Sequence, residues 1–126
     1  MIPPHLLDTR FGFEEMRAIQ ASVGHGGVIA FDKRTAIPDL VRYTFGFGAD
    51  ESCGKCTPCR LGSRRIEKIF EGIVQRGFAS GAEKQEWEEI IAALKLTSLC
   101  GHGVGLADFA ESVRAHYGKE LAQCFK

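Results

Sequence analysis

The chain has 126 residues, of which 44% are hydrophobic and 25% charged, the size and composition of one ordinary globular domain. Sixteen basic residues balance sixteen acidic ones, and this zero net charge argues against a nucleic-acid-binding protein, which usually carries a basic surplus. No apolar run approaches the roughly 20 residues of a transmembrane helix, and the N-terminus lacks the basic start and apolar stretch of a signal peptide, so we expect a soluble cytoplasmic protein without direct membrane insertion.

The first 32 residues predict a short α/β segment rather than a complete module. Apolar residues recur at near-helical spacing over residues 13–23, and a glycine-rich stretch at 24–27 ends this pattern. Residues 28–31, Val-Ile-Ala-Phe, then form a short β-type run. Because a single strand without a partner is marginal in water, we expect residues 1–32 either to be the remnant of a longer chain or to pair with another subunit.

The next two predicted helices flank a cluster of cysteines. Thr35 is the expected N-cap of the first helix, which is predicted to stop in the Gly-Phe-Gly stretch at 46–48. The second helix has Thr57 as its expected N-cap, Pro58 at its first position and Gly77 just past its end. Their apolar faces are expected to be Ile37, Leu40, Val41, Thr44 and Phe45 in the first helix and Ile66, Ile69, Phe70, Ile73 and Val74 in the second.

Two further helices complete the prediction. Ser80 and Glu83 form a capping box at the start of the third helix, and Gly118 is the expected C-cap of the fourth. The buried stripes are expected to be Trp87, Ile90, Ile91 and Leu94 in the third helix and Leu106, Phe109, Ala110, Val113 and Tyr117 in the fourth. Four amphipathic helices joined by short links predict a mainly α fold, a small helical bundle over residues 33–126.

The cysteines are the most informative feature of the sequence. Five are present, at Cys53, Cys56, Cys59, Cys100 and Cys124. The first three have the Cys-x-x-Cys-x-x-Cys spacing by which one loop wraps three corners of an iron–sulfur cubane, as in bacterial ferredoxins. Cys100, 41 residues after Cys59, can supply the fourth thiolate, because the chain reverses direction twice in the predicted bundle and returns to the same end. The sequence therefore predicts a four-cysteine [4Fe-4S] site.

Charge near the cysteines supports this interpretation, because a cluster held by four thiolates carries net negative charge. Between residues 50 and 70 there are five cations against three anions, among them Lys55, Arg60, Arg64 and Arg65. The N-terminus of the helix that starts near Pro58 adds a partial positive charge. We expect these groups to offset the charge of the cluster.

Other interpretations of the same residues remain open at this stage. Four cysteines can bind structural zinc, although zinc ligands usually come as two pairs, and the thiols can instead form a redox switch in an interaction module. Cys124 has no partner at ligand spacing and is expected to be a spare thiol. His102 is expected to line the pocket, or alternatively to ligate or hydrogen-bond the cluster, and His25 is expected to be a loop residue, or alternatively to face a flavin or a partner subunit.

Three stretches of the sequence together resemble one family. They are ESCGKCTPCR at 51–60, SLC at 98–100 and GHGGVIAFD at 24–32. The chain is similar to the C-terminal third of the NADH-binding flavoprotein subunit of complex I, and to its relatives in NAD-dependent formate dehydrogenases and NAD-reducing hydrogenases. That region is a helical bundle with one [4Fe-4S] cluster after a small β-grasp (SLBB-like) domain. The resemblance implies that residues 1–32 are the tail of a β-grasp domain and that the ligands are Cys53, Cys56, Cys59 and Cys100.

The same resemblance implies a module that relays single electrons between FMN and further Fe–S clusters of an NAD(H)-linked oxidoreductase complex. FMN and NAD(H) are expected on a missing domain or partner chain, and the other expected partners are a [2Fe-2S] subunit and an Fe–S-rich large subunit. The sequence has no Ser/His/Asp triad, paired-carboxylate site or P-loop, so the chain is not expected to be catalytic alone. Arg60-Leu61-Gly62 replaces the Arg-Glu-Gly common in respiratory complex I and looks more like the formate dehydrogenase branch.

Overall fold

The structure, a computed structural model, describes residues 1–24 and 26–126, and it confirms the predicted helical bundle. The elements in chain order are a 3₁₀ turn η1 (Pro4–Leu6), α1 (Phe13–Ala18), α2 (Ile37–Asp50), a π-helical turn η2 (Pro58–Gly62), α3 (Ser63–Arg76), α4 (Gly81–Thr97) and α5 (Gly101–Gln123). Helices α2 to α5 form the bundle, in which α2 and α4 each contact both α3 and α5. Within the described residues, no helix is long and apolar enough to cross a membrane.

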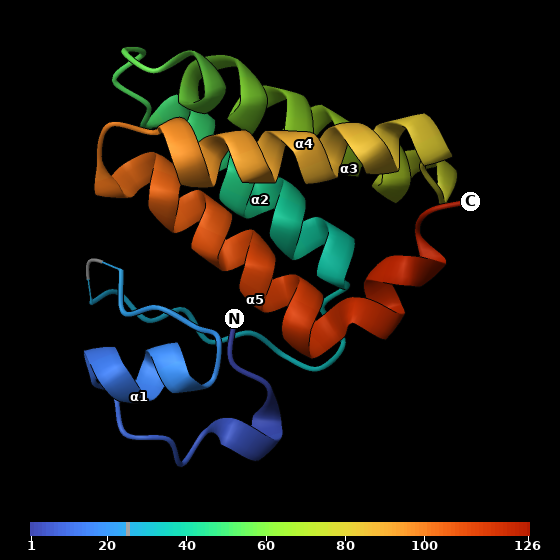
Figure 1. Ribbon diagram of the computed structural model, residues 1–126. Coiled ribbons are helices and arrows are strands. Elements are labelled where there is room, and N and C mark those ends of the chain that lie inside the picture. The colour runs from blue at the N-terminus through green and yellow to red at the C-terminus, as the bar shows by residue number, and fades with distance from the viewer. Residues whose placement is uncertain (25) are drawn as a thin grey trace.

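The arrangement of the helices brings two distant segments of the chain together. Figure 1 shows the loop before α3 and the loop between α4 and α5 at the same end of the bundle, with the C-terminus at the opposite end. Since α3 and α4 run the length of the bundle in opposite directions, they carry the chain away from this end and back again. The cysteines of both loops are therefore neighbours, as the sequence predicted.

An aromatic cluster around Trp87 forms the centre of the core. The Trp87 ring lies 5.7 Å from that of Phe45 on α2 and 5.0 Å from that of Phe70 on α3, both in edge-to-face geometry that favours aromatic pairs. All three side chains are buried, and the predicted apolar faces supply most of the remaining core. The buried aliphatic residues include Val41, Ile66, Ile69, Ile73, Ile91, Leu94, Leu106 and Val113. Of the predicted faces, Val74 is exposed.

Helix α2 does not stop at the glycines where the sequence predicted its end. It runs through Gly46 and Gly48 to Asp50, because both glycines lie at helix contacts. A Cβ atom at Gly48 would lie 2.6 Å from Leu106 Cδ2 of α5, and one at Gly46 would lie 2.6 Å from Glu67 Oε1 of α3. The glycines thus permit α2 to approach α5 and α3 closely, and packing outweighs their low helix propensity.

Three predicted helix caps are also wrong. Thr35 is not the N-cap of α2: that position is Ala36, whose side chain cannot cap, and Pro38 lies in the first turn. Thr57 has helical backbone angles and makes no side-chain cap, because the helical turn already begins with the bond from Arg60 N–H to Cys56 O, 2.8 Å long. Gly118 does not end α5, which continues to Gln123 across a kink at Tyr117. By contrast, the capping box of Ser80 and Glu83 at the start of α4 is confirmed in both of its hydrogen bonds.

The N-terminal segment differs from its prediction in two respects. Helix α1 ends at Ala18, well before residue 23, and the turn that follows is tied to α5 by a 2.6 Å hydrogen bond between His116 Nε2 and the Ile19 carbonyl. The strand expected at residues 28–31 does not form: Val28 and Ile29 are each 77% exposed, and no strand of the described chain lies beside them. A strand needs a partner edge for its N–H and C=O groups. His25 lies outside the described residues.

Candidate iron–sulfur site

The triple-cysteine loop is held in shape by its own backbone and by one arginine. Gly54 has a positive φ of 78°, a conformation that side chains with a Cβ rarely adopt, and it turns the chain between Cys53 and Cys56. Arg60 Nη1 donates a 2.6 Å hydrogen bond to the Gly54 carbonyl and so ties the loop to the first turn of η2. Cys59 lies within this π-helical turn, a type of turn that occurs frequently at functional sites.

The remote cysteine reaches the same place from the other loop. Cys100 is the N-cap residue of α5, shortly after the end of α4. Its neighbour Leu99 donates its backbone N–H to Cys56 Sγ over 3.3 Å, although the two residues are 43 positions apart. The structure therefore brings together the two segments that the sequence analysis paired.

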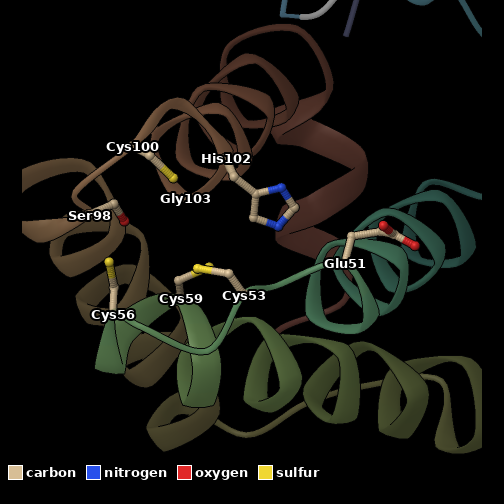
Figure 2. Close-up of a pocket in the computed structure, with 8 residues that line it drawn as sticks. All are labelled: Glu51, Cys53, Cys56, Cys59, Ser98, Cys100, His102 and Gly103. Carbon is tan, nitrogen blue, oxygen red and sulfur yellow. The ribbon is translucent and has the colours of Figure 1, made fainter.

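All four predicted ligands line one cavity of about 140 Å³. The lining residues are Glu51, Cys53, Cys56, Cys59, Ser98, Cys100, His102 and Gly103. Figure 2 shows the sulfur atoms of Cys56 and Cys100 on facing sides of this space and that of Cys53 directed into it, whereas the Glu51 carboxylate points away from the thiols.

The size of the cavity bears on what it can hold. A single water needs roughly 10–15 Å³ of such space. Four sulfur atoms that ligate one zinc ion lie about 2.3 Å from the metal, so they leave almost no further space between them. A cavity of about 140 Å³ between four thiols therefore suits a group of several atoms. The donor set and the volume fit an iron–sulfur cluster better than one metal ion.

The four thiols differ in their exposure to solvent. Cys59 is buried and Cys56 half-buried, whereas Cys53 and Cys100 are exposed. The cavity is therefore covered by the protein on the η2 side and lies at the surface on the side of the other two cysteines.

Two serine hydroxyls at the site were not singled out by the sequence analysis. Ser52 Oγ accepts a 3.2 Å hydrogen bond from Gly54 N–H and lies 3.3 Å from Cys59 Sγ, so its own proton is available to that sulfur. Ser98 Oγ is buried and has no hydrogen-bond partner in the described part of the chain. Both serines stand one or two positions before a cysteine, and this pattern is the signal that could have identified them.

His102 and Gly103 shape the wall of the cavity at the start of α5. His102 lines it as predicted, and its Nε2 lies 2.8 Å from the Gly48 carbonyl of α2, so a proton on that nitrogen ties α5 to α2. Gly103 leaves room for its neighbours: a Cβ there would lie 2.7 Å from Ser98 Cβ and 3.6 Å from Cys59 Cβ. This glycine allows α5 to approach both cysteine loops.

Two of the cations expected to offset the cluster's charge point elsewhere. Arg64 pairs with Asp50 over 2.6 Å and with Glu67 over 2.7 Å. Arg65 makes two 2.7 Å bonds to Glu86 of α4, which lower the pKa of that carboxyl. The prediction is thus wrong for these two arginines, because they pair with carboxylates of α2, α3 and α4 instead. Among the described residues that line the cavity there is no lysine or arginine.

Cys124 lies apart from the other cysteines. It is buried near the C-terminus, its Sγ is 3.4 Å from the Glu120 carbonyl, and it does not line the cavity. Burial raises the pKa of its thiol, which reduces the fraction of reactive thiolate. Its carbonyl accepts a 2.7 Å hydrogen bond from Ala79 N–H, so its role in the structure is to pack the C-terminal end of α5.

Comparison with known proteins agrees with this geometry. The family described as the NADH-ubiquinone oxidoreductase-F iron-sulfur binding region matches residues 39–124. The chain belongs to this family. The matched range contains most of α2, all of α3 and α4, and all four cysteines of the cavity, and it confirms both the resemblance seen in the sequence and the expected cofactor, a [4Fe-4S] cluster.

Individual relatives are redox subunits. The NADP-reducing hydrogenase subunit HndC of Solidesulfovibrio fructosivorans is 33% identical over 97 residues, 77% of this chain and 20% of that protein. The mitochondrial NADH-ubiquinone oxidoreductase 51 kDa subunit of Neurospora crassa is 28% identical over 122 residues, 96% of this chain and 24% of that protein. A crystal structure of NAD+-reducing [NiFe]-hydrogenase in the H2-reduced state matches with a TM-score of 0.65 and 36% identity, covering 74% of this chain and 16% of that chain. The chain thus spans less than a third of the length of these relatives.

Proposed function

We propose that Cys53, Cys56, Cys59 and Cys100 ligate one [4Fe-4S] cluster and that the chain relays single electrons through it. The observation that carries this proposal is the convergence of four thiols, from two segments far apart in the sequence, around one cavity of about 140 Å³. When bound, the cluster supplies one-electron redox chemistry at a potential that its surroundings adjust.

The residues around the cavity support that role in three ways. The backbone N–H of Leu99 and the hydroxyl of Ser52 are directed at cysteine sulfurs, where they stabilise negative charge. Cys59 is buried and shields the site from water on one side. Cys53 and Cys100 are exposed, so a redox partner can approach the site from the opposite side.

The wider assembly is part of the same proposal. We infer that the electrons come from a reduced FMN that exchanges hydride with NAD(H) on another domain or chain, and that they pass to further Fe–S centres on a [2Fe-2S] subunit and an Fe–S-rich large subunit. The names of the relatives, an NADH-ubiquinone oxidoreductase subunit and NAD(P)-reducing hydrogenases, support an NAD(H)-linked complex. Among NAD(H)-linked complexes in general, the Arg60-Leu61-Gly62 sequence favours the formate dehydrogenase type. Five unpaired cysteines favour a reducing, cytoplasmic compartment.

Anaerobic purification followed by iron, sulfide and zinc analysis tests the ligand assignment. We expect about four irons and four sulfides per chain and an electron paramagnetic resonance (EPR) signal after reduction. Cys56→Ser should abolish or convert the cluster and strongly destabilise the loaded bundle, because ligation joins segments 41 residues apart. Cys124→Ser is the matched control and should keep the cluster, because Cys124 does not line the cavity.

Other outcomes identify the competing interpretations. Stoichiometric zinc without iron in a colourless protein would show a structural zinc module. A protein without metal whose thiol count falls on oxidation would show a redox switch. Full cluster content and unchanged thermal stability in Cys56→Ser would contradict the ligand assignment itself.

A further inference from the structure

Ser98 presents a buried hydroxyl to the cavity and has no partner for it. Its Oγ makes no hydrogen bond to any residue of the described chain, and Figure 2 shows it close to Cys56 and Cys100 at the edge of the space between the thiols. An unpaired buried hydroxyl destabilises a folded protein. Such a group in a native site calls for an acceptor that the protein itself does not provide.

The position of this side chain is well defined by its neighbours. Ser98 is the C-cap residue of α4, and its backbone N–H donates to the Leu94 carbonyl over 3.3 Å. On its other side the side chain fills the space left by Gly103, where a Cβ would lie 2.2 Å from Ser98 Oγ and 2.7 Å from Ser98 Cβ. The backbone bond and the close contact with α5 hold the hydroxyl at the wall of the cavity.

Three other donors near the cavity already have acceptors. Leu99 N–H is bonded to Cys56 Sγ, and the hydroxyl of Ser52 lies against Cys59 Sγ. His102 Nε2 faces the Gly48 carbonyl. Among the described residues that line the cavity, Ser98 is therefore the hydroxyl donor that remains free for a bound group.

We propose that Ser98 donates its O–H to a sulfur atom of the bound cluster and thereby raises the midpoint potential. This inference rests on the proposed [4Fe-4S] site. A hydrogen bond to sulfur is stronger in the reduced cluster, which carries one more negative charge, than in the oxidised one. Ser98 is thus a positioning and tuning residue, and its removal should make the cluster harder to reduce.

Redox titration of the loaded protein, followed by EPR, tests this role with Ser98→Ala. At a fixed potential the ratio of reduced to oxidised cluster should fall about tenfold, which for a one-electron centre is a midpoint potential lower by about 59 mV. Thr97→Val is the matched control, because Thr97 is the preceding residue but donates its hydroxyl to the Ala93 carbonyl over 2.7 Å and does not line the cavity. Its potential should equal that of the wild type.

A second measurement reports the hydrogen bond directly. Electron–nuclear double resonance in H2O and D2O should show, besides the exchangeable protons of Leu99 N–H and Ser52, a further strongly coupled exchangeable proton in the wild type that Ser98→Ala lacks and Thr97→Val keeps. An unchanged potential with unchanged proton couplings in Ser98→Ala overturns the inference. If Ser98→Ala does not retain the cluster, Ser98→Thr keeps a hydroxyl and should load with the wild-type potential, and its failure to do so would refute a role of the hydroxyl. A wild-type protein without any cluster would refute the proposed function instead.

Discussion

Replacing Gly103 by alanine tests whether close approach of α5 to the cysteine loops shapes the site. The new Cβ would lie 2.2 Å from Ser98 Oγ, 2.7 Å from Ser98 Cβ and 3.6 Å from Cys59 Cβ. The first two distances are well below van der Waals contact. The hydroxyl can rotate away, but Ser98 Cβ is fixed next to the backbone. The loop that carries Ser98 and Cys100 must therefore move away from the cavity.

The magnitude follows from two opposing effects. Alanine in place of glycine inside a helix stabilises by up to about 1 kcal/mol, whereas forcing an extra carbon into a packed contact costs about 1–3 kcal/mol. Gly105→Ala is the matched control, because Gly105 lies in the same helix and a Cβ there would have no neighbour within 4 Å. The difference between the free energies of unfolding of Gly103→Ala and Gly105→Ala isolates the overlap and should be about 1–3 kcal/mol.

Urea denaturation of both proteins without the cluster measures this difference, and cluster content after anaerobic reconstitution measures its effect on the site. We expect Gly105→Ala to be slightly more stable than the wild type with normal cluster content. Gly103→Ala should be less stable than Gly105→Ala and should retain less iron. Equal stabilisation by both alanines, together with full cluster content, would show that the close contact at Gly103 does not shape the cavity.

Three further predictions concern the bundle and the thiols. Trp87→Ala should lower the free energy of unfolding by about 3–5 kcal/mol, because its ring contacts Phe45 and Phe70 in the core, and a loss below about 1 kcal/mol in urea denaturation would contradict this packing. The bond from Ser80 N–H lowers the pKa of Glu83 below its usual 4.5. The capping box therefore stabilises the fold above pH 4.5, and this stabilisation is lost as the pH falls through the pKa of Glu83 in the folded state. Glu83→Gln should flatten the acid limb of a curve of stability against pH, and an unchanged limb would exclude this contribution. Cys124 of the cluster-free protein should react more slowly with iodoacetamide than the exposed cysteines, because burial raises its pKa, and mass spectrometry that finds it alkylated first would refute this.

The sequence alone was sufficient where a feature depends on residues close together in the chain. The capping box of Ser80 and Glu83 needs only a spacing of three residues, and the predicted box is the observed one. The spacing of the triple-cysteine motif likewise places three thiols on one loop and one turn. The apolar periodicity predicted the core faces that surround Trp87, because a helix must bury such a stripe.

Long-range contacts decided the rest. Gly46 and Gly48 continue α2 instead of ending it, because their missing side chains face α3 and α5 across helix contacts that no local pattern reveals. Residues 28–31 have the composition of a strand but do not form one. A strand needs the edge of a partner strand, and the described part of the chain does not supply such an edge here.

The same division applies to the site itself. The spacing of the cysteines predicted which four thiols line the cavity, whereas no sequence pattern predicted the directions of Arg64 and Arg65 or the buried hydroxyl of Ser98. A side chain's charge or hydrogen-bonding capacity is a property of its residue type, but its partner is chosen by whichever group the packed helices place within reach. The sequence therefore determined which chemistry is available to this protein, and the tertiary structure decided which groups face the cavity.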